Sequence, residues 1–73
     1  SEGAFNVVIP RGFGGRIVLE VLDLAGRRVL LERVMGSGGQ VIPLNLEHVP
    51  AGSYVVIVRS EVQVALSTVH VMR

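Results

Sequence analysis

The side chains that could act as acids, bases, nucleophiles or metal ligands are few and scattered in this chain. Cysteine is absent, and the histidines, His48 and His70, lie far apart. The carboxylates occur singly, at Glu2, Glu20, Asp23, Glu32, Glu47 and Glu61. Metal sites and acid–base pairs need such groups at close, recognisable spacings. The sequence therefore predicts no catalytic residue and no metal site, and it implies no cofactor.

A glycine-rich stretch, residues 12–15 (Gly-Phe-Gly-Gly), superficially resembles a phosphate-binding loop. Phosphate loops present backbone N–H groups at the start of a helix and add a lysine and a serine or threonine. This stretch lacks both side chains and precedes a segment with the pattern of a strand. We interpret it as a flexible connection between strands.

The composition limits the classes of protein to which the chain can belong. Its 73 residues suffice for one domain, and seven basic against six acidic side chains give a net charge of +1. Nucleic-acid binding needs clustered positive charge, so no nucleic acid is expected as a partner. No apolar run approaches the roughly 20 residues of a membrane-spanning helix. The first residues have no feature of a signal peptide, so we interpret 1–73 as one domain excised from a longer precursor.

Apolar residues recur at about every second position, and valine and isoleucine are frequent, which is typical of strands. The alternation and the intervening turn residues predict these strand segments: 4–9, 16–23, 28–35, 40–45, 53–60 and 63–72. The sequence therefore predicts an all-β domain, a small immunoglobulin-like antiparallel β-sandwich of about six to seven strands.

The faces of the strands indicate their places in the sandwich. Segments 16–23 and 53–60 are apolar on both faces, which favours central strands. Segment 63–72 is more amphipathic and is predicted to be an edge, onto which another chain could add a strand. A homodimer through edge strands is therefore a hazard for the isolated domain. The alternative is an ordinary edge, blunted by Arg59, His70 and Arg73.

Two of the turns have specific predictions. Residues 24–27 connect two strands, and Gly26 suits the left-handed backbone position of a short hairpin loop. Residues 36–39 (Gly-Ser-Gly-Gly) are predicted to form a mobile hairpin tip that tolerates substitution.

Three motifs resemble a known family. Residues 3–7 read Gly-Ala-Phe-Asn-Val, residues 21–27 read Val-Leu-Asp-Leu-Ala-Gly-Arg, and residues 49–58 begin Val-Pro-Ala-Gly-Ser-Tyr. In this order they resemble the C-terminal sorting domains of cargo carried by the type IX secretion system of Bacteroidetes. The Pro-rich opening of that family is absent, Val49 replaces its commoner leucine, and the final residues are less lysine-rich than usual.

The resemblance implies a role as an address. It implies recognition in the periplasm by the type IX outer-membrane translocon, with a shuttle protein and a sortase-like peptidase as further partners. A cargo domain is expected to precede this one and to reach the outer-membrane surface or the medium. Whether the domain is then cleaved or retained stays open.

The recognition residues that the resemblance suggests are Gly26, Arg27, Pro50, Gly52, Tyr54 and Arg73, together with the last strand. For the glycines and the proline, a purely structural role in turns is the alternative. Tyr54 is expected to be a core aromatic with its hydroxyl at the rim. Arg27 and Arg73 are the main candidates for direct contact, because the sequence gives neither a structural role.

Other function classes fit the same composition. One is an immunoglobulin-like binding or packing module, retained on a surface protein or a component of the secretion machinery. A carbohydrate-binding module would need exposed aromatic rings, and Phe13 is the one aromatic residue predicted to lie in a loop. A structural spacer that packs on the preceding domain would also account for the apolar surplus.

Overall fold

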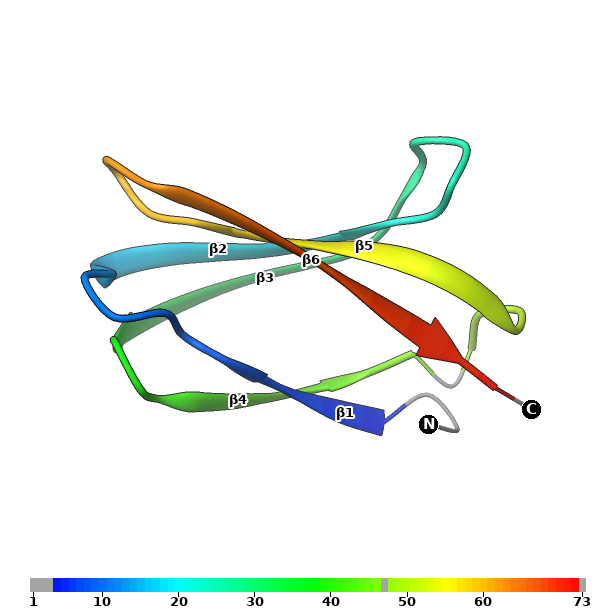
Figure 1. Cartoon of the computed structure of the whole chain (residues 1–73), viewed down its shortest axis with the longest axis horizontal. Coiled ribbons are helices and arrows are strands. Elements are labelled where there is room, and N and C mark those ends of the chain that lie inside the picture. The colour runs from blue at the N-terminus through cyan, green and yellow to red at the C-terminus, as the bar shows by residue number, and fades with distance from the viewer. Residues whose placement is uncertain (1–3, 47, 73) are drawn as a thin grey trace.

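The computed structural model describes residues 4–46 and 48–72, which form two layers of antiparallel strands (Figure 1). The strands are β1 (Ala4–Val8), β2 (Gly14–Leu22), β3 (Arg28–Ser37), β4 (Val41–Asn45), β5 (Gly52–Arg59) and β6 (Val64–Val71). One layer is a two-stranded sheet of β1 and β4, and the other is a four-stranded sheet in the order β3-β2-β5-β6. This architecture confirms the predicted all-β fold, with strands close to the predicted segments.

The core lies between the two layers and is formed by alternate residues of the central strands. Ile17, Leu19 and Val21 of β2 are almost completely buried. The facing residues come from the two-stranded sheet and the segments that continue it, and they include Val7, Ile9, Leu44 and Leu46. Because side chains alternate across a strand, a single register places every one of these residues inside.

The two strands that are apolar on both faces, β2 and β5, are the central pair of the four-stranded sheet, as predicted. On β5 even the outward Ile57 is only 9 % exposed. The last strand, β6, lies at the edge, which also confirms the prediction. The smaller sheet has β1 at one of its edges, so strands from both layers keep an unpaired edge among the described residues.

The glycine-rich stretch after β1 connects two strands, as predicted, and it begins with a closed turn. A hydrogen bond from Phe13 N to Pro10 O, 3.3 Å long, closes a turn, and the Phe13 ring is only 7 % exposed. Gly14 and Gly15 already belong to β2. Phe13 lies in the connection before β2, as predicted, and the turn directs its side chain into the core.

The expectation of a mobile hairpin tip at residues 36–39 is wrong. The strands that this segment joins, β3 and β4, belong to different sheets, so it is a crossover between layers. Gly39 N donates to Ile9 O at 2.7 Å, and Ile9 N donates to Gln40 O at 2.8 Å. A β-carbon on Gly38 would lie 2.9 Å from Arg11 Cα and 3.0 Å from Pro10 O. The segment is thus packed against the turn that follows β1.

Replacing Gly38 by alanine is expected to destabilise the domain by about 1–3 kcal/mol, because the added methyl meets backbone that must shift. The matched control is Gly14→Ala, where a β-carbon meets nothing within 4 Å. That change should alter stability by less than about 1 kcal/mol. Urea unfolding of both variants measures the difference, and equal midpoints would contradict the crowded crossover.

Candidate functional site

The residues predicted for recognition gather at one end of the sandwich. Leu22, the last residue of β2, pairs with Val55 of β5, and Gly52 pairs with Val71 near the end of β6. This register places the loop after β2, the start of β5 and the end of β6 at the same end, on the right of Figure 1. Gly26, Arg27, Pro50, Gly52 and Tyr54 all lie in this region, whereas Arg73 lies outside the described residues.

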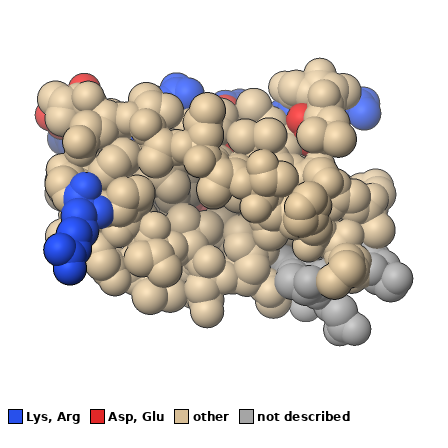
Figure 2. Space-filling view, in the orientation of Figure 1, with Lys and Arg blue, Asp and Glu red and all other residues tan. Residues whose placement is uncertain are grey.

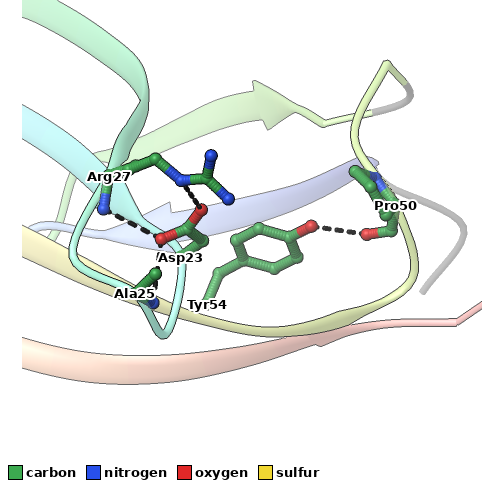
Figure 3. Close-up of polar contacts among 5 residues, drawn as sticks. All are labelled: Asp23, Ala25, Arg27, Pro50 and Tyr54. Carbon is green, nitrogen blue, oxygen red and sulfur yellow. Dashed lines mark hydrogen bonds and ion pairs between the residues drawn. The ribbon is translucent and has the colours of Figure 1, made fainter.

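The loop between β2 and β3 is organised by the carboxylate of Asp23. Its Oδ1 accepts hydrogen bonds from Ala25 N at 3.0 Å and from Arg27 N at 2.8 Å. Its Oδ2 pairs with Arg27 Nε at 3.2 Å, as Figure 3 shows. Gly26 has a φ of +86°, the left-handed position that was predicted for it. The Asp-Leu-Ala-Gly-Arg motif therefore forms a folded loop, in which Asp23 at one end and Arg27 at the other bind each other.

These contacts lower the pKa of Asp23 below its ordinary value of 3.8, and the hydrogen bond from the Arg27 backbone is the main cause. Partial desolvation opposes the shift, while the Ala25 N–H and the Arg27 charge add to it. The carboxylate therefore stays ionised in the folded domain at neutral pH. The Arg27 side chain is still 82 % exposed, so its guanidinium can bind Asp23 and face a partner at once.

Tyr54 holds the turn that leads into β5. Its ring is buried, at 4 % exposure, and its hydroxyl donates a hydrogen bond to Pro50 O (Figure 3). A tyrosine near the start of a strand that bonds backbone a few residues upstream forms a tyrosine corner in β-sandwich domains. The expectation of a core aromatic with its hydroxyl at the rim is confirmed. The Pro-Ala-Gly-Ser-Tyr motif thus has a structural role of its own.

A groove runs between β1 and β6, where the two layers leave their edges apart. Its volume is about 360 Å³, and it is lined by uncharged residues of both strands, among them Phe5, Val7, Ala65, Ser67 and Val69. Figure 2 shows this side of the molecule, in which uncharged side chains cover the area over β6 and β1. The strand edges beside the groove are where an extended peptide could add as a further strand.

The described residues offer little reaction chemistry. No three metal-ligating side chains come together within 4–46 and 48–72. This described part of the chain contains no helix that is long and apolar enough to span a membrane. Ser53 Oγ lies 2.8 Å from His70 Nδ1 on adjacent strands. Both belong to the outward side of the sheet, where the contact links β5 to β6.

The structure changes the argument for two predicted contact residues. Arg27 was chosen because it had no evident structural role, but its backbone and side chain both bind Asp23. Pro50 was assigned to a turn, and its carbonyl also accepts the Tyr54 hydroxyl. Sequence reasoning did not identify the groove, because alternation within β1 and β6 does not show that their edges lie on the same side of the sandwich.

Replacing Tyr54 by phenylalanine removes the hydroxyl and keeps the ring in the core. We expect a loss of about 1 kcal/mol, the usual net value of one hydrogen bond. Urea unfolding is the measurement, and circular dichroism should show unchanged β-structure. A variant as stable as the wild type would show that the bond to Pro50 contributes nothing.

Replacing Asp23 by asparagine tests the carboxylate of the loop. Because its pKa is lower in the folded domain than its ordinary value, the ionised group stabilises the fold above about pH 4 and loses this effect as pH falls. The melting temperatures of wild type and Asp23→Asn should therefore differ most at pH 7, and the difference should shrink as the pH falls below 3.8, the ordinary pKa of the group. Glu61→Gln, in an exposed turn, is the control, and a difference independent of pH would refute the assignment.

Comparison with known proteins assigns the fold and its motifs to one family. A family model described as "Secretion system C-terminal sorting domain" matches residues 1–72. A search of curated proteins found no match. The matched region spans all six described strands, the Asp23 loop and the Tyr54 corner. This chain therefore belongs to the family of C-terminal sorting domains of the type IX secretion system, which is not a family of catalysts.

Proposed function

We propose that residues 1–73 form the C-terminal domain of a longer precursor and act as its secretion address. The type IX translocon recognises the folded domain in the periplasm and moves the preceding cargo across the outer membrane. A shuttle protein and a sortase-like peptidase are its further partners in this proposal. The family match over residues 1–72 is the observation that carries this proposal.

The edge of β6 is the part of the fold best suited to direct recognition. Between Ala65 and Val69 it is uncharged, and it borders the groove shared with β1. An extended segment of a partner can form main-chain hydrogen bonds with such an edge while its side chains enter the groove. The same edge also suits pairing with a second copy of the chain, which is a competing use of this surface.

The loops at the end of the sandwich supply a second element of recognition in this proposal. Tyr54 is buried, so it acts by holding the shape of the turn at Pro50. Gly26 and Gly52 act through backbone conformation, whereas the exposed Arg27 offers a charged group to the translocon. Arg73 remains a proposed contact by virtue of its position after β6.

An export assay tests the address directly. Residues 1–73 are fused behind a signal peptide and a fluorescent reporter in a type IX-competent bacterium. We expect the reporter at the cell surface or in the medium, and its loss there in a strain without the translocon. Folded reporter trapped in the periplasm of both strains would instead favour a retained binding or packing module.

Ser67→Lys tests the edge and the groove in the same assay. Ser67 is exposed and lines the groove, so a lysine there places a charge where an added strand would pack. Export is expected to fall about tenfold, equivalent to about 1.4 kcal/mol of lost binding. The control is Val62→Lys in the β5–β6 turn, where Val62 is 85 % exposed. Equal export of the two variants would argue against recognition at this edge.

A further inference from the structure

The outward side of the four-stranded sheet carries an uneven distribution of charge. We use the name outer arginine face for these outward residues: Arg16, Val18, Arg33, Met35, Ile57 and Arg59. Arg33 of β3 is opposite Val18 of β2, and Val18 is opposite Arg59 of β5. Arg16 is two residues before Val18 on the same side of β2. The register therefore fixes a row of two arginines around an apolar centre, with a third beside it.

Glu20, the acidic residue beside this face on β2, does not neutralise the arginines. Glu20 of β2 contacts Arg28 Nη1 at 3.4 Å and Arg59 Nη2 at 3.8 Å, so one carboxylate is shared by two guanidinium groups. Arg16 and Arg33 form no ion pair with any described residue, and both are exposed. The face therefore has a clear excess of positive charge in a chain whose net charge is only +1.

Between these charges the face is apolar. Val18 is half-buried, and Met35, opposite Arg16, is 70 % exposed. A groove of about 340 Å³ is lined by Arg16, Val18, Arg33 and Met35. Leu66 of β6, next to Ile57, is 69 % exposed. Aliphatic surface bordered by unneutralised arginine is typical of the centre of a protein interface, where arginine is enriched.

The chemistry of the face favours a protein partner with carboxylates over a lipid surface. Every basic residue of the chain is arginine, whose planar group binds a carboxylate through two parallel hydrogen bonds. Arg33 and Arg59 are two strands apart, a spacing of about 10 Å that a folded surface can match. Binding to an anionic membrane relies on larger basic clusters, of about four to eight residues.

We infer that the outer arginine face docks on an acidic surface of a secretion-machinery protein, whose carboxylates pair with Arg16 and Arg33 around an aliphatic contact at Val18 and Met35. This inference rests on the proposed function and gives the chemistry of one partner. It uses a surface distinct from the β6 edge and from the loops at the other end of the sheet.

The test is the export assay with charge-reversed variants. Arg16→Glu and Arg33→Glu should each lower export about tenfold, equivalent to about 1.4 kcal/mol. Arg11→Glu is the matched control, because Arg11 is exposed in the turn after β1 and undergoes the same change of charge. Arg16→Lys and Arg33→Lys should retain more export than the glutamate variants. Urea unfolding verifies that each variant is folded.

The outcomes separate the inference from the proposed function. If the wild type is exported, and Arg33→Glu is exported as well as Arg11→Glu, the inference is overturned. The proposed function as a secretion address would still stand. Wild-type reporter that is never exported would overturn both. Suppressors of Arg33→Glu that exchange an acidic for a basic residue in another protein would support the inference directly. Binding to phosphatidylglycerol vesicles that is lost in Arg16→Glu, with normal export, would assign the face to a membrane and contradict it.

Discussion

The packing of a wide sheet on a narrow one is the constraint on which the rest of this structure depends. The chain has no cysteine, so the core between the layers must hold the fold. Two strands, β2 and β5, supply most of the inward surface of the larger layer, and their inward side chains are buried in the core between the layers. A four-stranded sheet cannot be covered completely by two strands, so β6 extends past its cover. The groove between β1 and β6 follows from this mismatch.

The motifs that identify the family have structural explanations within the fold. Asp23 ties its loop with three hydrogen bonds, Gly26 supplies a backbone angle that other residues rarely adopt, and Tyr54 closes a corner. A sorting signal built in this way presents a shape, since its characteristic residues are used internally. The contacts proposed above use groups that remain exposed, such as the guanidinium of Arg27 and the edge of β6.

The strands, and which of their residues are buried, could be predicted from alternation, because apolar residues recur at every second position of a half-buried strand. The central places of β2 and β5 followed from apolar residues on both faces. The prediction for residues 36–39 was wrong, because glycines are as suitable for a crowded crossover as for a tight hairpin. The choice between the two depends on whether β3 and β4 share a sheet. The loop position of Phe13 was predicted, but its burial was not, because a local pattern does not show that a turn returns its side chain to the core. The groove and the outer arginine face needed register between distant strands, which no local pattern contains.

The position of β6 has a mechanical consequence. The strand is the last described element, lies at the edge of its sheet and pairs only with β5, to which it is joined by a short turn. A pulling force on its C-terminal end would load the Gly52–Val71 pair first and then each following pair in turn. Such a hairpin opens like a zipper, one pair at a time, whereas a strand pulled along its axis between two neighbours must shear all its bonds together. The domain is therefore easiest to open from the end where the Asp23 loop and the turn at Pro50 lie, and the core strands β2 and β5 can stay paired while the last strand is drawn away.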